Sequence, residues 1–384
     1  MEVIFWLLAA VVVYVYAGYP LLLVVLSGLG ARRPVRIGDA EPNVTLIVSA
    51  FNEASVIADK IRNSLALDYP REKIEIVVIS DASDDGTDEI VGQFAAQGVR
   101  LLRMNDRGGK TLGLNAGVRS AQGDIVVFSD ANAMYLPDAI RKMTRNFADP
   151  AVGAVVGEST YADAEGGAQK SESLYWRYET GIKRLETQIG STVGGDGAIY
   201  AIRRSLYRDM RADALSDFIN PMQIVMAGYR CIYEPEAQSV EEAAEGFDKE
   251  FRRKVRIVNR AWRATWTLPA LLNPLRFGWF SLELFSHKLL RWLMPLFLVA
   301  VLLLNVLLVE RAPLYSWLLV LQLVFYALAL AGYLTRGRPT QPRLIYVPYY
   351  FCLVNIASAR GIIEAYRGRT YTTWATPRAT SKPS

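Results

Sequence analysis

The sequence reads Ser-Ala-Phe-Asn-Glu at residues 49–53, Ser-Asp-Ala-Ser-Asp-Asp-Gly-Thr at 80–87, Gly-Gly-Lys-Thr at 108–111 and Ser-Asp-Ala-Asn at 129–132. Each of these polar or glycine-rich stretches lies at the end of an apolar run or shortly after one. In an open α/β sheet, ligands bind at the carboxyl ends of the strands. We therefore expect the four stretches to meet at one edge of such a sheet.

Valine- and isoleucine-rich runs precede these stretches, and segments with helical spacing separate them. The runs have the composition of buried strands and cover Thr45–Ser49, Ile74–Ser80 and Asp124–Asp130. The helical segments are Ser55–Leu67, Thr87–Gln97 and Thr111–Ser120. This alternation predicts an α/β fold with a mixed, mostly parallel sheet and right-handed crossovers. Further strand candidates at Val152–Glu158 and Tyr229–Tyr233 extend the predicted cytosolic domain over residues 43–265.

The composition argues against several classes of protein. Hydrophobic residues make up 52% of the 384 residues and the mean hydropathy is +0.15, with apolar residues concentrated towards both ends. Much of the net charge of +5 lies beside those apolar segments, so we interpret it as attraction to anionic lipid headgroups and not to nucleic acid. Cys231 and Cys352 offer no disulfide framework, which fits a reducing cytosolic face. A single histidine, His287, argues against a serine triad or a histidine-rich metal site.

Three segments are long and apolar enough to cross a bilayer. Residues 1–30 contain a run that is too long for a cleaved signal peptide, so we expect a retained transmembrane anchor. Three arginines follow it, and the positive-inside rule then places the chain from residue 36 onward in the cytosol. They are Arg32, Arg33 and Arg36. Residues 289–309 and 314–334 form two more predicted spans, which gives a multi-pass protein of the cytoplasmic (inner) membrane.

The segments beside these spans have different compositions. Residues 31–42 read as a linker, and residues 266–288, rich in tryptophan and phenylalanine, read as interfacial helices. Arg360 and Glu364 interrupt the apolar run within residues 344–366, and a fourth span would export the arginines that follow. We favour an interfacial or re-entrant helix there, with a fourth transmembrane helix as the alternative. Residues 367–384 form the predicted cytosolic tail.

The first two polar stretches suit recognition of a nucleotide. Phe51 and Asp81 lie just past the first two strands, where an aromatic face can stack on a base and a carboxylate can accept the imide N–H of a pyrimidine. Ser49 and Glu53 can add hydrogen bonds to the base or the ribose. The alternative for residues 80–87 is a polar turn with a helix N-cap, which does not explain a charge directly after a β run.

Asp130 and Asn132 suit a divalent cation. With one residue between them at a strand end, their oxygens lie on one side of the chain and can bind Mg²⁺ or Mn²⁺ bridging a diphosphate. A simple turn is the alternative. Lys110, at a helix start, can reach a phosphate, or it is a solvated surface charge. Its loop is not an ATPase loop, because Met104 stands where that pattern needs glycine.

The second half of the domain supplies candidates for the reaction itself. Asp217 can act as the general base that removes a proton from an acceptor hydroxyl, although an N-cap aspartate is the alternative. Gly195-Asp196-Gly197 can let an acceptor approach closely, or it forms a tight turn. Arg253 and Arg256 can hold a leaving diphosphate by bidentate hydrogen bonds, or their helix binds lipid headgroups.

Taken together these motifs resemble glycosyltransferase family 2, membrane-bound inverting sugar transferases with a GT-A nucleotide-diphospho-sugar transferase fold. The resemblance covers roughly Val44 to Trp262 and implies roles for three positions. Asp81 would contact uracil, the motif at Asp130–Asn132 would bind ribose and metal, and Asp217 would be the catalytic base. The cellulose- and hyaluronan-synthase branch ends its domain with Gln-x-x-Arg-Trp, for which this chain has residues 253–257.

Three residues depart from that pattern. Asn132 replaces the second acid of the metal motif, and Ser216 replaces the acid that precedes the catalytic base. Ile257 stands where the branch has a tryptophan that stacks on an acceptor sugar. The last departure argues against processive synthesis through a built-in polymer channel.

We therefore expect an inverting, metal-dependent glycosyltransferase. Its donor would be a nucleotide-diphospho-sugar, with a UDP-sugar expected. Its acceptor would be a membrane lipid or lipid-linked saccharide in cell-envelope or exopolysaccharide synthesis, with envelope-assembly proteins as candidate partners. Three alternatives stay open: a processive polysaccharide synthase, a non-catalytic nucleotide-sugar-binding subunit of a secretion complex, and a nucleotidyltransferase that releases pyrophosphate.

Overall fold

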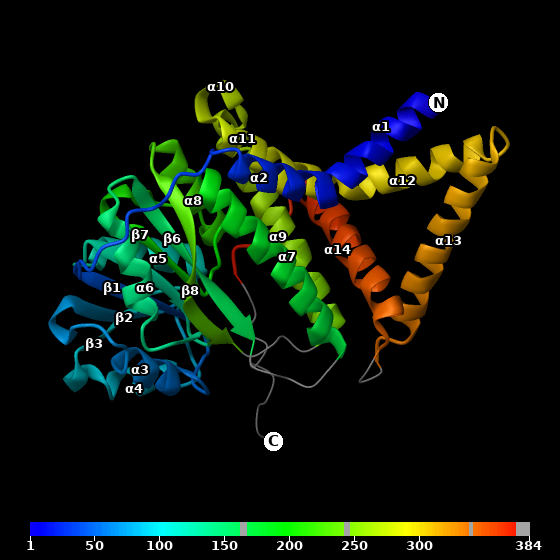
Figure 1. The fold of residues 1–384 in the computed structure, drawn as a ribbon. Coiled ribbons are helices and arrows are strands. Elements are labelled where there is room, and N and C mark those ends of the chain that lie inside the picture. The colour runs from blue at the N-terminus through cyan, green and yellow to red at the C-terminus, as the bar shows by residue number, and fades with distance from the viewer. Residues whose placement is uncertain (162–166, 242–245, 338–340, 374–384) are drawn as a thin grey trace, which may run out of the picture.

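The chain folds into an α/β domain attached to a group of long apolar helices (Figure 1). The structure is a computed structural model that describes residues 1–161, 167–241, 246–337 and 341–373. The predicted tail at residues 367–384 therefore lies outside the described residues beyond Thr373.

In the described residues, eight strands form one sheet in the order β3-β2-β1-β4-β7-β6-β8-β5. The strands are β1 (Val44–Ala50), β2 (Ile74–Ser80), β3 (Val99–Arg103), β4 (Ile125–Asp130), β5 (Met134–Tyr135), β6 (Val152–Tyr161), β7 (Ile199–Arg203) and β8 (Arg230–Glu241). Strands β3, β2, β1 and β4 run parallel, and β7 then pairs antiparallel with β4 and with β6. The prediction of a mixed, mostly parallel sheet is confirmed.

Helices cover both faces of this sheet. The helices of the domain are α3 (Ile57–Leu65), α4 (Thr87–Gly92), α5 (Lys110–Ser120), α6 (Ala139–Thr144), α7 (Gly167–Ile189), α8 (Ser216–Met226) and α9 (Phe247–Thr265). Short 3₁₀ turns lie at Arg71–Lys73, Ala95–Gln97, Arg145–Ala148 and Arg204–Leu206. Every residue of β1 is buried, because helices pack against both of its faces.

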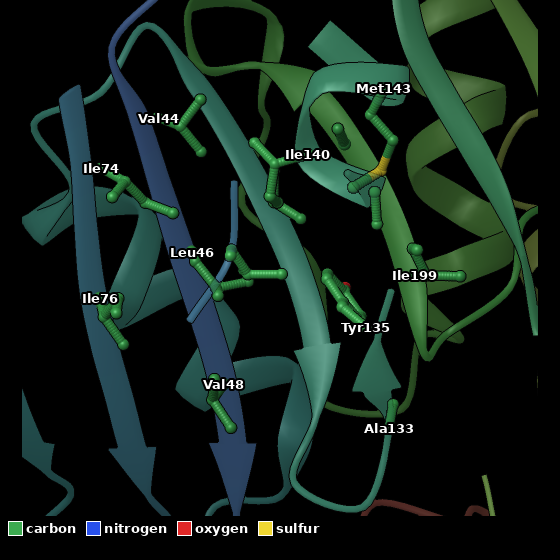
Figure 2. Packing of buried hydrophobic residues seen from close by; sticks show 14 of the residues in the cluster. Val44, Leu46, Val48, Ile74, Ile76, Ala133, Tyr135, Ile140, Met143 and Ile199 are labelled. Carbon is green, nitrogen blue, oxygen red and sulfur yellow. The ribbon is translucent and has the colours of Figure 1, made fainter. Parts of the chain in front are cut away.

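Alternation along β1 divides the core into two layers. Val44, Leu46 and Val48 point to the side covered by α3 and α6, where they pack with residues of β2 (Figure 2). Ile47 points the other way and packs in the cluster that contains Leu114 of α5. Since successive side chains of a strand alternate between faces, this one strand anchors both layers.

The apolar helices form the second part of the structure. They comprise α1 (Glu2–Val13), a π-helical turn η1 (Tyr14–Gly18), α2 (Tyr19–Gly28), a 3₁₀ turn η6 (Pro269–Leu272), α10 (Pro274–Phe277), α11 (Trp279–Glu283), a π-helical segment η7 (Leu284–Leu289), α12 (Leu290–Leu308), α13 (Pro313–Leu334) and α14 (Arg343–Tyr366). In the described residues, three helices are long and apolar enough to cross a membrane: Glu2–Gly28, Trp279–Leu308 and Pro313–Leu334. This is the composition of a membrane protein.

The second of these helices begins earlier than the span expected at residues 289–309. It starts at Trp279, within the stretch expected to be interfacial, and α11, η7 and α12 continue one another without a break. The sequence does not predict this early start, because the first turns of the helix carry the polar residues Glu283, His287 and Lys288. These residues lie on the side that packs against the α/β domain, and His287 is 2% exposed.

Helix α14 is one unbroken helix of 24 residues over the segment whose membrane position the sequence left open. It packs against α9 of the α/β domain as well as against α12 and α13 (Figure 1). The side chain of Asn259 on α9 donates to the carbonyl of Gly361 at 3.3 Å and to that of Arg369 at 3.2 Å. The chain that leaves α14 is thereby held against the α/β domain.

Candidate active site

The strand ends bring the predicted motifs to one edge of the sheet. Ser49 of β1 is in register with Ile79 of β2 on one side and with Asp130 of β4 on the other. Because parallel strands end at the same edge, the chains that leave these three strands run side by side. The structure therefore contains the strand register that the sequence prediction of the site assumes.

Asp81 anchors the glycine loop that precedes α5. Its carboxylate is 3% exposed and accepts hydrogen bonds from the backbone N–H of Gly108 at 2.8 Å and of Gly109 at 2.8 Å. The charge after β2, which a polar turn alone left unexplained, thus holds the backbone that leads into Lys110. Contact of Asp81 with a nucleotide base stays a prediction.

The loops that follow β1 and β2 are tied to each other. The Asn52 side chain donates to Asp84 Oδ1 at 2.8 Å and accepts from the Asp84 backbone N–H at 3.1 Å. Asn52 and Ala82 have φ of 55° and 57°, a region that non-glycine residues rarely occupy. Backbone strain of this kind persists where the surroundings fix it, and it is common at binding sites.

Two other donor-side candidates, Ser49 on β1 and Phe51 just past it, differ in their surroundings. Ser49 is 7% exposed, and in the described residues its hydroxyl oxygen has no hydrogen-bond partner. The ring of Phe51 is covered by the guanidinium of Arg107, which lies 3.7 Å from the ring centre. A base that stacks on Phe51 therefore has to replace Arg107 or share the ring with it.

Lys110 and Asp130 form an ion pair at the centre of this edge. The Lys110 ammonium also donates to the carbonyl of Gly197 at 3.2 Å. Asn132 lies two residues past Asp130, at the start of the turn before β5. In the described residues, no group of three or more His, Cys, Asp or Glu side chains is placed to hold a metal ion. A cation at this site would therefore take its remaining ligands from the substrate and water, as Mg²⁺ commonly does.

The charges around Asp130 fit such a cation. Burial raises the pKa of Glu241, at the end of β8, to about 8, and the negative charges of Asp196 and Asp130 add to the effect. The charges of Lys110 and Arg253 oppose the shift, so carboxylates and cations alternate around Asp130. Repulsion among neighbouring carboxylates is an effect that a bound cation relieves. The donor set of Asp130 and Asn132 therefore fits Mg²⁺ or Mn²⁺.

Asp217 lies in the first turn of α8 and faces the same centre. Its Oδ1 is buried and, in the described residues, has no hydrogen-bond partner. Burial raises the pKa of Asp217, against the lowering effect of the Lys110 charge. A raised pKa and a free lone pair are what a carboxylate needs to accept a proton from a substrate hydroxyl.

The glycine loop before β7 separates Asp217 from Lys110. The Gly195 N–H donates to the backbone carbonyl of Asp217 at 2.6 Å. A Cβ built on Gly197 would lie 3.5 Å from Asp217 Oδ2 and 3.5 Å from Lys110 Nζ. The candidate base and the lysine that binds Asp130 therefore meet across one glycine, from segments more than one hundred residues apart in the sequence.

Two arginines of α9 were predicted to face the diphosphate, and the structure distinguishes them. Burial lowers the pKa of Arg256, and the charges of Asp130 and Asp217 oppose that shift, so Arg256 lies near both carboxylates. Arg253 instead donates to Glu250 at 2.6 Å within its own helix. Arg260, one turn beyond Arg256, donates to Thr111 at 3.0 Å and fixes the start of α5.

Lys60 is a buried charge that the sequence reading missed. It is 0% exposed, donates to the carbonyl of Ala133, and lies 4.0 Å from the centre of the Tyr135 ring. Burial lowers its pKa to about 7, although Asp130 and Glu241 oppose the shift. Through its hydrogen bond to Ala133, Lys60 therefore holds the turn that carries Asn132. A signal was present, because Lys60 is one turn from Ile57 and next to Ile61 on the apolar face of its helix.

The chain beyond α14 covers the glycine loop. Gly109 has φ +87°, and a Cβ on it would overlap the backbone carbonyl of Thr372. Any side chain at position 109 would thus strain the backbone and push this segment away. The described end of the chain forms one wall beside Asp81 and Lys110.

The part of the chain that carries most of these site residues matches a known protein family. Residues 45–211 match the family model described as "Glycosyl transferase family 2". Residues 45–211 thus form a glycosyltransferase family 2 domain. The match includes β1 to β7 and the motifs from Ser49 to Gly197, while Asp217 and α9 lie beyond it.

Two curated proteins that this chain is similar to are named as synthases. Poly-beta-1,6-N-acetyl-D-glucosamine synthase of Staphylococcus aureus (strain COL) is 28% identical over 214 residues, which are 54% of this chain and 51% of that protein. Beta-monoglucosyldiacylglycerol synthase of Synechocystis sp. is 35% identical over 130 residues, which are 32% of this chain and 27% of that protein. The matched regions thus span about half of the first relative and about a quarter of the second.

A solved structure supports the GT-A fold of this chain. The mannosyltransferase PcManGT from Pyrobaculum calidifontis, in complex with GDP-Man and Mn²⁺, superposes with a TM-score of 0.70 at 23% sequence identity. The superposition covers 95% of this chain and 99% of that one, so the likeness extends to the apolar helices. The predicted fold class is confirmed.

The raised pKa of Asp217 predicts how activity depends on pH. The base acts when ionised, so kcat/KM should be retained above its pKa and fall as the pH falls through it. We expect the acid limb of the kcat/KM profile to lie above the ordinary range of an aspartate. Thermal unfolding across the same pH range is the control for loss of structure. An acid limb at the ordinary aspartate value would contradict the raised pKa.

Gly195→Ala tests the loop beside Asp217. A Cβ at Gly195 would lie 2.7 Å from the Asp217 backbone carbonyl, closer than such atoms pack, so the loop and Asp217 must separate. We expect turnover to fall about tenfold or more, since a shift of about 1 Å near reacting groups has effects of that order. Nucleotide binding should change little. Gly228→Ala is unsuitable as a control because of its positive φ, whereas Gly181→Ala meets nothing within 4 Å and should be neutral.

Proposed function

We propose that this chain is an inverting, metal-dependent glycosyltransferase of the cytoplasmic membrane. It transfers a hexose from a nucleotide-diphospho-sugar, with a UDP-sugar expected, to a membrane lipid or lipid-linked saccharide in cell-envelope or exopolysaccharide synthesis. The observation that carries the proposal is the placement of Asp217 and Lys110 on the two sides of Gly197. It provides a base and a cationic partner for the leaving group within one small site.

The donor half of the proposed reaction uses the strand ends. Phe51 and Asp81 hold the base, with Ser49 and Glu53 on the base or ribose. Asp130 and Asn132 hold the divalent cation, which as a Lewis acid stabilises charge on the departing diphosphate when bound. Lys110 and Arg256 add positive charge beside the same phosphates, and the charges of Asp130 and Asp217 act on Arg256.

The acceptor half uses the base and its loop. Asp217 takes the proton from the acceptor hydroxyl, and the oxygen attacks the anomeric carbon from the face opposite the diphosphate. The new C–O bond forms as the bond to the diphosphate breaks, which inverts the anomeric configuration. The Gly195-Asp196-Gly197 loop adjoins Asp217 and Lys110, and its two glycines present no side chain to an approaching acceptor.

Two observations favour a membrane-held acceptor. The described residues contain three helices able to span a bilayer, and α14 and α9 connect them to the α/β domain. A 35% identical relative is named for a diacylglycerol product. The arginines at positions 32, 33 and 36 place the α/β domain on the cytosolic side in this proposal.

A processive synthase is the second candidate, because one relative is named as a polysaccharide synthase. Product analysis separates the two. The purified protein in lipid nanodiscs is given a radiolabelled UDP-sugar, and the products are resolved by chromatography and mass spectrometry. The proposal predicts one labelled lipid of discrete mass. A ladder of sugars would favour the synthase, and label in no lipid or saccharide would contradict both.

A further inference from the structure

A buried polar cluster joins the helix Trp279–Leu308 to the glycosyltransferase domain. His287, in η7 of that helix, is 2% exposed and lies between two carboxylates of α7. Its Nδ1 is 2.6 Å from Glu186 Oε1, and its Nε2 is 3.1 Å from Glu179 Oε2. Buried polar groups with good partners fix the relative position of the elements that carry them.

Glu186 is the centre of this cluster. It is fully buried and accepts from the Tyr19 hydroxyl of α2 at 2.7 Å. Its other oxygen accepts from the Thr192 hydroxyl at 3.1 Å and from the Val193 backbone N–H at 3.1 Å. One carboxylate therefore connects two apolar helices to the chain segment that begins directly after α7.

That segment leads into the loop that touches the candidate base. Gly195, two residues past Val193, donates to the backbone carbonyl of Asp217 at 2.6 Å. Lys288, the neighbour of His287, approaches the same loop, with its Cε 3.8 Å from a Cβ position on Gly194. Contacts of His287 with Glu186, of Glu186 with Thr192 and Val193, and of Gly195 with Asp217 thus form a continuous series.

A second contact from the same helix reaches the other side of the base. The ring of Phe218, which follows Asp217, meets the ring of Trp292 edge to face at a centroid distance of 5.8 Å. His287 and Trp292 are five positions apart on one helix, so the helix supports both the loop before β7 and the first turn of α8. Among the described residues, these hydrogen bonds join His287, Glu186, Glu179 and Tyr19 and do not include the donor-side residues.

We propose that His287 is a positioning residue for the acceptor half of the reaction. Through Glu186 it fixes residues 192–195 against Asp217, so that the membrane helix and the base keep one geometry. This inference rests on the proposed function, because it uses Asp217 as the base. It predicts that loss of the His287–Glu186 contact lowers transfer and leaves nucleotide binding in place.

Two conservative variants of His287 test the contacts of its two ring nitrogens separately. His287→Gln places its amide near the former Nε2, which keeps the contact with Glu179 and removes the one with Glu186. His287→Asn places its amide near the former Nδ1, which keeps the contact with Glu186 and removes the one with Glu179. A role limited to holding helices together predicts similar effects from both variants, whereas positioning through Glu186 predicts that Gln is the more damaging.

The measurement uses the full chain in nanodiscs made from membrane lipid extract with added diacylglycerol. Lipid-dependent UDP release gives the transfer rate, and calorimetric titration with UDP and Mn²⁺ gives donor-side affinity. We expect His287→Gln to lower kcat about 100-fold, the order expected when a catalytic group is misplaced by about 1 Å, with UDP affinity within about twofold. His287→Asn should retain more activity than His287→Gln. Ser286→Ala is the matched control, because it removes a 2.9 Å contact to Tyr14 in the same turn without touching α7.

The outcomes are distinct. Wild-type kcat in His287→Gln, or an equal loss in His287→Asn and His287→Gln, would overturn the inference and leave the proposed function intact. If His287→Gln does not fold, Thr192→Val tests the next contact in the chain, because it removes only the hydroxyl that Glu186 accepts. Full activity in Thr192→Val would then overturn the inference. Wild-type protein that binds UDP but releases none with any lipid would overturn the proposed function, and the inference would fall with it.

Discussion

Asp217→Asn protein should bind nucleotide as the wild type does and lose transfer activity almost completely. The amide has the size and shape of the carboxylate but cannot take a proton from the acceptor hydroxyl. General-base catalysis contributes about 10²- to 10⁴-fold, so we expect kcat to fall about a thousandfold. Titration with UDP and Mn²⁺ and the rate of lipid-dependent UDP release measure the two quantities separately.

Asp209→Asn is the control for this prediction. Asp209 is paired with Arg119 on the surface, and its side chain is more than half exposed. Exposed ion pairs contribute little to stability, so this variant should behave as the wild type. Weak nucleotide binding by a folded Asp217→Asn variant would contradict the assignment, because it would place Asp217 in the donor site.

Asp130→Ala should remove metal-dependent donor binding. Asp130 is the one carboxylate of the proposed metal pair, and removing it leaves Asn132 as the remaining protein ligand of that pair. We expect Mn²⁺ to lose its effect on UDP affinity and activity to fall by about 10²-fold or more, since Lewis-acid stabilisation of the leaving group is worth several kcal/mol. Mn²⁺ binding followed by electron paramagnetic resonance tests this without any turnover.

Asn132→Asp is the matched variant in the opposite direction. A second carboxylate binds a hard divalent cation more strongly than an amide oxygen does. We therefore expect Mn²⁺ to bind several-fold more tightly to Asn132→Asp than to the wild type. Unchanged Mn²⁺ binding in both variants would contradict a metal site at Asp130 and Asn132.

The parallel half of the sheet, and the strand ends where the candidate donor-binding residues lie, could be predicted from the sequence for a physical reason. β1, β2 and β4 are buried on both faces, so they read as continuous apolar runs with a polar residue where each strand leaves the core. The alignment of parallel strand ends then places Ser49 and Asp130 in register without further information. The local sequence pattern was sufficient to predict this edge because the edge consists of the ends of individual strands, and each strand is one continuous stretch of sequence.

The other half of the site depends on contacts that no local pattern encodes. The short strand β7 and the long helix α7 were not predicted, and they carry the chain to and from the loop at Gly194–Gly197. The hydrogen bond between Gly195 and Asp217 joins a loop to the first turn of α8, and the sequences of these two segments equally suit a tight turn and an N-cap. Only the packing of α8 on β8 and α9 decides between these interpretations.

Charged residues in buried places were also missed for a common reason. Lys60 and His287 are polar residues in otherwise apolar helix faces, and sequence reading assigns such residues to the surface. Both are fully packed because each finds a partner far away in the chain, at Ala133 and at Glu186. Buried charges are retained where such a partner exists, and the partner is visible only in the fold.

The most direct test of the account is UDP release by purified wild-type and Asp217→Asn protein in lipid nanodiscs. A panel of UDP-sugars is supplied with Mn²⁺ or Mg²⁺, with and without membrane lipid extract. The account predicts release that requires one donor, a divalent cation and lipid, and that stops in Asp217→Asn. Protein that binds UDP but releases none across the panel, or release that continues unchanged in Asp217→Asn, would contradict a lipid-directed glycosyltransferase with Asp217 as its base.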